Sequence, residues 1–236
     1  MDSARIAALL EPFLEGCPTS RTFRDAESAL SPTQLDQIST YIDLLLRWNA
    51  RINLTAIRNP EEIVTRHFGE SLFLARHLFP NPCHLEPGSC FAPRVIDLGS
   101  GAGFPALPLN IWAPHVHLQL IESNHKKAAF LREVARALTL TDIDVIADRA
   151  ETVSTRQTPD TQADIVTFRA VEKFDRILPL AVTFLAPSAR LALLISAAQL
   201  PKLESQPDLT WQTEHIPKSQ QMILAIGRFN KRRNEI

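Results

Sequence analysis

Three of the seven glycines in this 236-residue chain fall within five residues. They are Gly99, Gly101 and Gly103, and they follow an apolar run, Val95–Leu98, that contains Asp97. Glycine lets the backbone approach a ligand where a Cβ would collide, and ligands of open α/β sheets bind outside the carboxyl ends of the strands. The segment therefore predicts a nucleotide-like cofactor at the end of a buried strand. A tight strand–helix turn without a ligand is the alternative, but it explains clustered glycines poorly in a glycine-poor chain.

The chain from residue 94 onward alternates short apolar runs with helical stretches. One such stretch, Lys126–Leu138, carries apolar residues at helical spacing. Candidate strands are residues 95–98, 117–121, 143–146, 165–168 and 191–195. Two later runs, residues 210–216 and 222–229, have no long helix between them and are candidates for an antiparallel pair that closes the sheet edge. This alternation favours an α/β fold, with a parallel sheet and helices on both faces.

The first 90 residues have helical patterns. Ser31-Pro32-Thr33-Gln34 has a capping serine, a proline at the first helical position and a glutamine that completes a capping box. Asn59-Pro60 repeats this start, and apolar residues recur at helical spacing after both. Four prolines and Gly88 within residues 80–93 indicate a linker. We expect a helical segment over 1–90, a cofactor-binding domain over 91–228 and a basic tail over 229–236.

Composition excludes several classes of protein. The formal net charge is −1, so a chain-wide basic field for nucleic acid is absent and any RNA contact must be a local patch. Cys17, Cys83 and Cys90 form no CxxC motif, which disfavours a disulfide framework or a zinc site. The most apolar region, residues 178–198, is broken by two prolines and an arginine. We expect a cytoplasmic protein that binds no metal and no membrane.

The glycine loop discriminates between cofactors. A dinucleotide fingerprint requires a glycine three positions after Gly101, where this chain has Phe104, and no Gly-Lys-Ser/Thr follows to make a P-loop. The order Asp-x-Gly-x-Gly-x-Gly suits S-adenosylmethionine, which has no phosphate, and its methionine end is expected near Asp97–Gly101. Glu122 ends the next apolar run and can accept hydrogen bonds from both ribose hydroxyls. The alternative for Glu122 is an acid favoured by a helix dipole.

Six motifs, in one order, resemble those of the RsmG (GidB) methyltransferases. They lie at residues 47–57 (W-N-x-x-x-N-L-T-A-I), 66–72 (R-H-x-x-D-S-L, with Glu70 for Asp), 97–109 (D-x-G-S/T-G-A-G-F-P), 123–134 (S-x-x-K-K/R-x-x-F-L-x-x-V), 148–151 (R-A-E) and 167–170 (S/T-x-R-A). The resemblance covers about residues 30–228. It implies a class I (Rossmann-like) methyltransferase fold: a mostly parallel seven-stranded sheet flanked by helices, with an N-terminal helical extension. Residues 91–228 would be the methyltransferase domain.

The resemblance also implies a function and a set of contacts. The family transfers a methyl group from S-adenosylmethionine to N7 of one guanine in 16S rRNA, and its motifs imply cofactor contacts at Gly99, Phe104, Ala150, Glu151 and Arg169. Phe104 would form an apolar wall near the methyl group, and Ala150-Glu151 would present backbone groups to the adenine. Arg169 would bind the cofactor carboxylate or an RNA phosphate; the alternative is a surface ion pair with Glu172 or Asp175. With the glycine-loop reasoning, the expected cofactor-binding residues are Gly99, Phe104, Ala150, Glu151, Arg169, Asp97, Gly101 and Glu122.

No catalytic residue is assigned, because N7 of guanine has a free lone pair and no proton to remove, so placement and electrostatics suffice. Phe104 and Trp48 are candidates to stack on a base, although a core role is favoured for Trp48. Arginines at 47, 51, 58, 66 and 76 form a loose basic segment that acids interrupt, so a solvated face explains them equally well. Because the chain is nearly neutral, we expect it to act on 16S rRNA within the small ribosomal subunit. We also expect a monomer.

Some positions depart from the family pattern, and residues 186–190 lack the glycines that are common before the fifth strand. Ala106 replaces a glycine, and Ser196 lies where a lysine–glycine pair is common. Three alternatives stay open: a methyltransferase of the same fold acting on a small molecule or a protein, a nicotinamide oxidoreductase, and a non-catalytic ribosome-binding relative. The N-terminal signature weighs against the first, and Phe104 weighs against the second.

Overall fold

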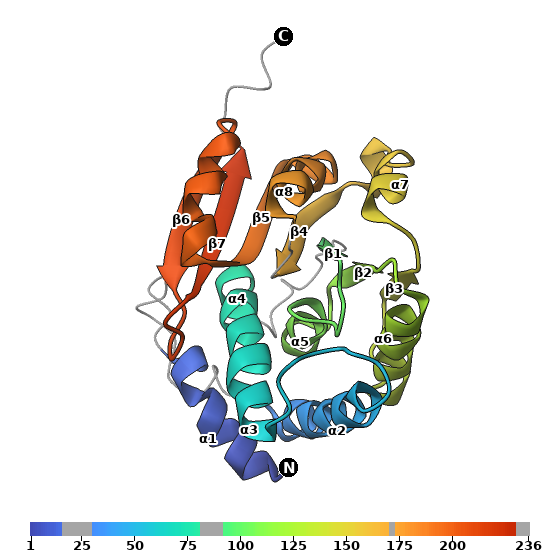
Figure 1. Cartoon of the computed structure of the whole chain (residues 1–236), viewed down its shortest axis with the longest axis vertical. Coiled ribbons are helices and arrows are strands. Elements are labelled where there is room, and N and C mark those ends of the chain that lie inside the picture. The colour runs from blue at the N-terminus through green and yellow to red at the C-terminus, as the bar shows by residue number, and fades with distance from the viewer. Residues whose placement is uncertain (16–29, 81–91, 170–172, 230–236) are drawn as a thin grey trace.

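The computed structural model describes residues 1–15, 30–80, 92–169 and 173–229. Seven strands form one sheet in the order β3-β2-β1-β4-β5-β7-β6 (Figure 1). They are β1 (Arg94–Leu98), β2 (His117–Ile121), β3 (Ile143–Ile146), β4 (Ala163–Arg169), β5 (Leu185–Ser196), β6 (Leu209–His215) and β7 (Met222–Phe229). Strands β1 to β5 are parallel, and β7 pairs antiparallel with β5 and β6. The predicted α/β class, and the antiparallel pair at the edge, are confirmed.

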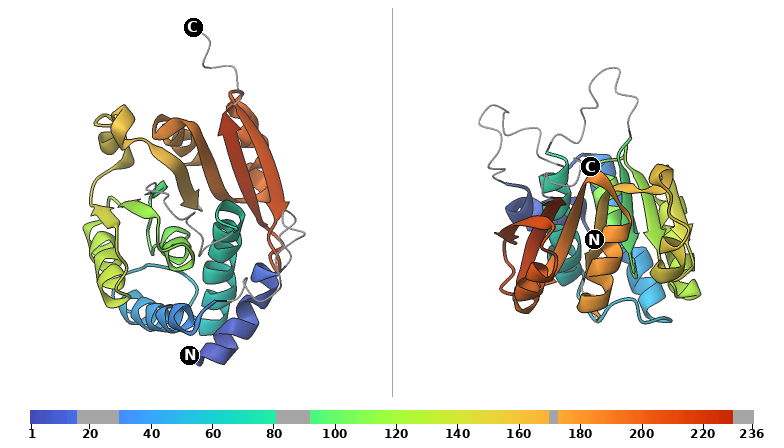
Figure 2. Two further views of the ribbon diagram at one scale, coloured as in Figure 1. Left: turned by 180° about the vertical axis from the view of Figure 1, so that it is seen from behind. Right: turned by 90° about the horizontal axis from the view of Figure 1, so that it is seen from above.

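Helices cover both faces of this sheet (Figures 1 and 2). They are α1 (Ser3–Leu14), α2 (Pro32–Asn49), α3 (Pro60–Glu62), the π-helix η1 (Ile63–Gly69), α4 (Glu70–Leu78), α5 (Ala106–Trp112), α6 (His125–Ala137), α7 (Ala150–Ser154), α8 (Phe174–Thr183) and the 3-10 helices η2 (Pro159–Thr161) and η3 (Ala197–Ser205). Alternate strand residues enter different cores. Val95 belongs to the buried cluster that contains residues of α1, α2 and α4 to α6, whereas Ile96 belongs to the cluster that contains residues of α7, α8 and η3.

The helix starts predicted from the sequence are present. The Ser31 hydroxyl accepts from the Gln34 N–H, and the Gln34 side chain accepts from the Ser31 N–H, which completes the capping box. The Asn59 side chain caps α3 by accepting from two backbone N–H groups. The helical stripe after Asn59 is not one α-helix, because α3 leads into seven residues of π-helix before α4. A π-helix changes which residues share a face, and such segments are frequent at functional sites.

The N-terminal helices and the sheet share one hydrophobic core. Ile6 of α1, Ile42 of α2 and Leu72 of α4 belong to the same buried cluster as Val95 and Leu118. The division at residue 90 therefore stays a prediction. The three cysteines, most of the predicted linker and the tail beyond Phe229 lie outside the described residues. Among the described helices, none is both long and apolar enough to cross a bilayer.

Tyr41 of α2 packs directly against the glycine loop. Its buried hydroxyl donates to the Ala102 carbonyl at 2.5 Å. Gly103 has φ +87°, and a Cβ there would collide with the Tyr41 hydroxyl and lie 2.5 Å from the Leu107 side chain. The third glycine is therefore required by the packing of α2 and α5 on the loop, as well as by its backbone conformation.

Substituting Gly103 separates these two requirements. Gly103→Ala should lower the free energy of unfolding by about 2–4 kcal/mol, from the left-handed backbone and the collision together. Gly101→Ala is the matched control, because Gly101 has φ +55° but its Cβ would lie 3.7 Å from the nearest atom, the Gly99 carbonyl oxygen. The control should lose about 1–2 kcal/mol in urea unfolding. Equal losses of unfolding free energy in the two variants would show that Tyr41 can move away from a Cβ at residue 103 at little cost.

Candidate functional site

The expected cofactor residues gather at the carboxyl edge of the sheet. Residue pairing aligns Leu98 of β1 with Ile121 of β2, and Ile121 with Ile146 of β3. Thr167 of β4 pairs with Asp97 on the other side of β1. The chain leaves β1 toward β2 on one side and reaches β4 on the other, so this edge is a topological switch point where ligands of such sheets bind.

Gly99 provides open space at this edge. It has φ +69°, and a Cβ placed on it would meet no atom of the protein within 4 Å. Its N–H donates to the Ile121 carbonyl at 2.8 Å, which fixes the loop against the end of β2. The opening is a cradle that a side chain would fill, and it fits the close approach of a ligand that the sequence predicts.

Glu122 is held by the backbone around it. One carboxylate oxygen accepts from the Gly101 N–H at 2.8 Å, and the other accepts from the Asn124 N–H at 2.7 Å. Each oxygen keeps a lone pair for a further donor, such as a ribose hydroxyl. The Gly101 N–H is used within the protein, so Gly101 supports Glu122 and is not a free backbone donor.

Asp97 is a buried acid with one unsatisfied oxygen. Its Oδ1 accepts from the Thr167 hydroxyl at 2.7 Å. Its Oδ2 is buried and has no hydrogen-bond partner among the described residues. Burial raises the pKa of Asp97 to about 7, against the opposing effect of the Thr167 hydrogen bond. The orphaned oxygen is a second group at this edge that a ligand donor can complete.

Phe104 is committed mainly to the protein interior. Its ring stacks on Tyr41 (centroids 5.3 Å apart, planes at 5°) and on His67 (4.7 Å, 20°), and the residue is 8% exposed. It therefore presents only a small part of its surface as the apolar wall that we expected. His67 itself is neutral, because burial and the nearby Arg169 and Arg66 lower its pKa to about 3.

Arg169, at the end of β4, pairs with a residue that the sequence reasoning missed. Its Nη2 donates to a Glu70 oxygen at 2.5 Å and to the Arg66 carbonyl at 2.9 Å. The two side chains of the ion pair are 10% and 2% exposed. Burial raises the pKa of Glu70 and lowers the pKa of Arg169. The alternative of a surface ion pair with Asp175 is wrong, since Asp175 pairs with Lys202.

The second terminal nitrogen of Arg169, Nη1, is buried and has no hydrogen-bond partner among the described residues. A guanidinium that is fixed through one nitrogen and unpartnered at the other suits a carboxylate or a phosphate. The other alternative partner, Glu172, lies outside the described residues.

Ala150 and Glu151, which we expect next to the adenine of the cofactor, are the first two residues of α7. Ala150 is half-buried and Glu151 is exposed in its first turn. Among the described residues no side chain caps this helix start, so its first backbone N–H groups remain available to a ligand. The chain path thus brings Ala150-Glu151 to the same sheet edge as Gly99.

The W-N-x-x-x-N-L-T motif stabilises the surroundings of the site through a network of hydrogen bonds. The Asn49 side chain accepts from the N–H groups of Leu54 and Thr55 and donates to the Thr55 carbonyl. The Thr55 hydroxyl in turn hydrogen-bonds to His67 Nε2 at 2.8 Å. The motif therefore fixes the loop that holds His67 against Phe104. The R-H-x-x-E spacing was the available signal for His67 and Glu70, but no contact could be derived from it.

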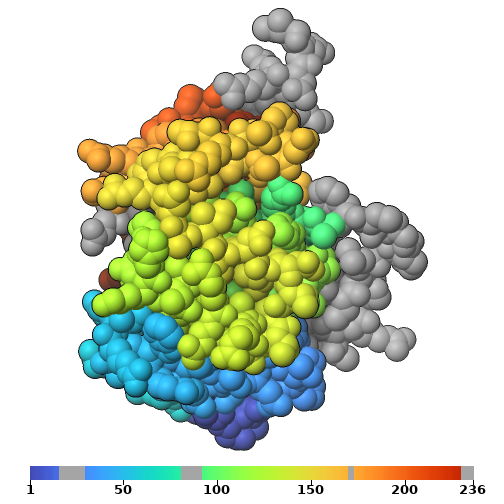
Figure 3. All heavy atoms as spheres, turned by 90° about the vertical axis from the view of Figure 1, so that its right-hand side faces the viewer, coloured from blue at the N-terminus to red at the C-terminus, as the bar shows by residue number. Residues whose placement is uncertain are grey.

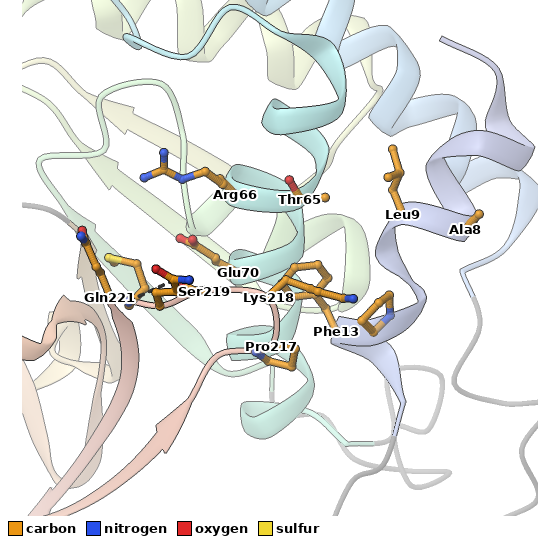
Figure 4. A pocket seen from close by; sticks show the side chains of 13 residues that line it. Ala8, Leu9, Phe13, Thr65, Arg66, Glu70, Pro217, Lys218, Ser219 and Gln221 are labelled. Atoms are coloured by element: carbon orange, nitrogen blue, oxygen red, sulfur yellow. Dashed lines mark hydrogen bonds between the residues drawn. The ribbon is translucent and has the colours of Figure 1, made fainter.

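A pocket of about 610 Å³ lies beside the ion pair (Figure 4). We call it the η1 pocket. Its walls come from α1, from η1 with Glu70, and from the loop between β6 and β7. Figure 4 shows Arg66 and Glu70 projecting toward the side of the pocket on which Gln221 lies. Both residues contact Arg169, so the pocket borders the end of β4. In the described part of the chain, no group of His, Cys, Asp and Glu is arranged to hold a metal ion.

A profile of the family described as rRNA small subunit methyltransferase G (GidB) matches residues 34–226. The chain belongs to this family. It is 42% identical over 162 residues to a Ribosomal RNA small subunit methyltransferase G of Chloroflexus aggregans, covering 69% of this chain and 64% of that protein. The protein of the same name from Bacillus subtilis is 38% identical over 61% of this chain and 57% of its own length. The chain thus spans somewhat more than half of these relatives.

Solved structures confirm the methyltransferase fold. M. jannaschii TYW2, in complex with AdoMet, superposes with a TM-score of 0.54 at 16% identity, over 77% of this chain and 79% of that one. Ribosomal protein L11 methylase of Lactobacillus delbrueckii gives a TM-score of 0.51 at 16% identity, over 69% of this chain and 80% of that one. At such low identity the likeness establishes the fold alone. The Rossmann-like class, with its N-terminal helical region, is thereby confirmed.

The raised pKa of Asp97 predicts a pH-dependent stability. An unfolded aspartate loses its proton near pH 4, whereas Asp97 in the native state keeps it until about pH 7. The native state holds the extra proton between these values, so its stability falls as pH rises across that interval, by up to about 1.4 kcal/mol per pH unit. Asp97→Asn keeps an acceptor for Thr167 and should lack this component.

Urea unfolding of both proteins at about pH 5 and about pH 8 measures this component. Glu70, His67 and other groups titrate alike in both proteins, so the difference between the two pH dependences isolates Asp97. Parallel pH dependences would show that Asp97 ionises as an ordinary aspartate.

Because the Arg169–Glu70 ion pair is buried, we expect a large loss of stability when its acid is removed. Glu70→Gln leaves the Arg169 charge buried and uncompensated, which should lower the free energy of unfolding by about 3–5 kcal/mol. Glu62→Gln is the control, because Glu62 and Arg66 form an exposed pair at 3.0 Å, with side chains 45% and 54% exposed. The control should lose less than about 1 kcal/mol. Similar losses in thermal or urea unfolding would contradict the burial of the Arg169–Glu70 pair.

Proposed function

We propose that this protein transfers a methyl group from S-adenosylmethionine to N7 of a guanine in 16S rRNA, within the small (30S) ribosomal subunit. One observation carries the proposal. The open cradle at Gly99, the carboxylate of Glu122 and the unpartnered nitrogen of Arg169 belong to residues at the ends of β1, β2 and β4, which meet at the switch point of a methyltransferase sheet. Membership of the family supports the rRNA substrate. We further propose a monomer that works in the cytoplasm.

The residues at this edge fit S-adenosylmethionine group by group. Gly99 gives room for the methionine part, and Arg169 Nη1 offers a donor to its carboxylate. Glu122 retains lone pairs for the ribose hydroxyls, and the uncapped start of α7 at Ala150-Glu151 offers backbone N–H groups to the adenine. The bound cofactor supplies the sulfonium methyl group.

The protein's own contribution is placement rather than proton transfer. Guanine N7 carries a lone pair and needs no base, which agrees with a site whose histidine, His67, stays neutral at physiological pH. The rings of Phe104 and His67 stack on each other next to the glycine loop. The η1 pocket gives the substrate base room beside Arg169. A base that is stacked in the RNA must be splayed out to reach this position, at a cost of a few kcal/mol.

A methyl-transfer assay tests the proposal. Labelled S-adenosylmethionine is offered in parallel to undermodified small subunits, large subunits and free rRNA, and digested RNA is analysed by mass spectrometry. We expect label as 7-methylguanosine on small-subunit RNA, with free rRNA a poorer substrate. Label on no RNA while the cofactor binds would favour a small-molecule or protein substrate, or a non-catalytic ribosome-binding role.

A Gly99 variant links this activity to the proposed cofactor site. Gly99→Asn fills the cradle with a side chain that tolerates the left-handed conformation better than other residues do. It should weaken S-adenosylmethionine binding at least tenfold in calorimetry, while thermal unfolding changes little. Unchanged affinity would place the methionine end of the cofactor elsewhere.

A further inference from the structure

A second pocket, of about 680 Å³, lies between the end of α2 and the start of α6. We call it the Trp48 pocket. It is lined by Arg47, Trp48, Arg51, Ile52, His125, Lys126, Ala129 and Glu133. Figure 3 looks onto this side of the molecule, where α2 (blue) lies directly below the α6 region (yellow-green). None of these residues belongs to the expected cofactor site, so the pocket requires a separate explanation.

The charges of the Trp48 pocket suit a polyanion. Arg47, Arg51 and Lys126 are exposed, and Glu133 is the one carboxylate in the lining. Within the described part of the chain, none of the three cations has an ion-pair partner, whereas Arg5, Arg66 and Arg169 are each paired with a glutamate. Three unpaired cations around one concave site make a local positive patch on a chain of net charge −1.

Trp48 supplies a fixed aromatic surface within this patch. The residue is half-buried, and its ring packs against Phe130 of α6 (centroids 5.7 Å apart, planes at 60°). This contact anchors the indole while part of it still lines the pocket. The core role favoured from the sequence therefore describes only part of the ring. An anchored aromatic ring among phosphate-binding cations is the arrangement by which proteins bind single-stranded nucleic acid.

Residues that adjoin the pocket lining in the sequence contact residues of the proposed cofactor site. Glu122 accepts from the Asn124 N–H, and Asn124 directly precedes His125 at the rim of the pocket. On the other wall, Asn49 follows Trp48 and fixes the loop that holds His67 against Phe104. A strand of RNA in the Trp48 pocket would therefore lie on the same sheet edge at which its target base reacts.

We propose that the Trp48 pocket binds a single-stranded segment of the RNA substrate. One base stacks on Trp48, and the neighbouring phosphates contact Arg47, Arg51 and Lys126. The segment is a flanking part of the substrate and is distinct from the methylated guanine. Binding is tolerant of sequence, because stacking and phosphate contacts carry little base information. This inference rests on the proposed RNA substrate, and the experiment below separates the two.

The test removes the charges and the ring separately. The triple variant Arg47→Gln/Arg51→Gln/Lys126→Gln eliminates the cations, and Trp48→Leu keeps an apolar contact with Phe130 but removes the flat ring. The matched control, Arg136→Gln/Arg176→Gln/Arg228→Gln, removes three exposed cations that lie outside the pocket lining. The probe is a fluorescein-labelled ten-nucleotide oligouridylate, whose binding is measured by anisotropy over a series of salt concentrations. S-adenosylmethionine affinity and circular dichroism report whether each variant stays folded.

The expected results follow from the chemistry of the pocket. The triple variant should reduce the slope of log Kd against log salt by about 2, which is about 0.7 for each phosphate that the variant no longer neutralises. Trp48→Leu should raise Kd by roughly tenfold and abolish most of the tryptophan quenching by the oligonucleotide. Both variants should raise KM for small subunits and leave cofactor affinity unchanged. The control variant should show less than half of the change in slope.

Three outcomes would overturn the proposal. Equal effects of the triple and control variants would mean that the pocket contributes only general charge. Tighter binding of polyglutamate than of oligouridylate, with no effect of Trp48→Leu, would assign the pocket to an acidic protein partner. If the wild-type protein methylates small subunits and both pocket variants have the same KM as the wild type, the RNA-binding role of the pocket is refuted but the proposed function stands. If wild-type protein binds oligouridylate through Trp48 yet methylates no RNA, the pocket stands and the proposed function fails.

Discussion

The stacking of Phe104 on Tyr41 and His67 joins the two halves of this protein. Phe104 belongs to the loop that follows β1, whereas Tyr41 and His67 come from the N-terminal helices. Because the Tyr41 hydroxyl also donates to the Ala102 carbonyl, α2 holds the loop at Ala102, whereas Gly99 keeps open space around it. The glycines then serve different purposes: Gly99 leaves space, Gly101 supports Glu122, and Gly103 permits the close packing of Tyr41. The cofactor cradle is thus shaped by helices that lie outside the expected methyltransferase domain.

Burial of charged groups gives the site its electrostatic character. Asp97, Glu70 and Arg169 are all buried, and each has a perturbed pKa because desolvation disfavours its charged form. The Arg169–Glu70 pair compensates one charge with another, yet Arg169 Nη1 and Asp97 Oδ2 remain without partners among the described residues. Unsatisfied buried polar atoms are costly, and here both lie at the one sheet edge where a ligand is expected. In the proposed function, polar groups of the bound cofactor would complete both atoms.

The two pockets are the surfaces that we propose for the RNA substrate, and each lies next to a residue of the proposed cofactor site. The η1 pocket borders Arg169 and Glu70, and the Trp48 pocket borders the start of α6 beyond Glu122. Both are lined in part by residues of the N-terminal helical segment, with the β6–β7 loop completing the first and α6 the second. A nearly neutral chain can still bind a polyanion if its unpaired cations are concentrated in such places. The helical extension therefore supports the glycine loop and contributes part of each surface that we assign to RNA.

The sequence by itself determined the alternation of strands and helices, the glycine loop after β1 and the capped starts of α2 and α3. These features depend on local periodicity and backbone preference, which a short segment expresses regardless of its surroundings. Family motifs added the expected site residues. Only the tertiary structure decided that Glu70 pairs with Arg169, that Phe104 is mostly buried and that a π-helix interrupts the segment before α4. The first two outcomes depend on contacts between residues up to about a hundred positions apart, and spacing along the chain carries no information on such contacts.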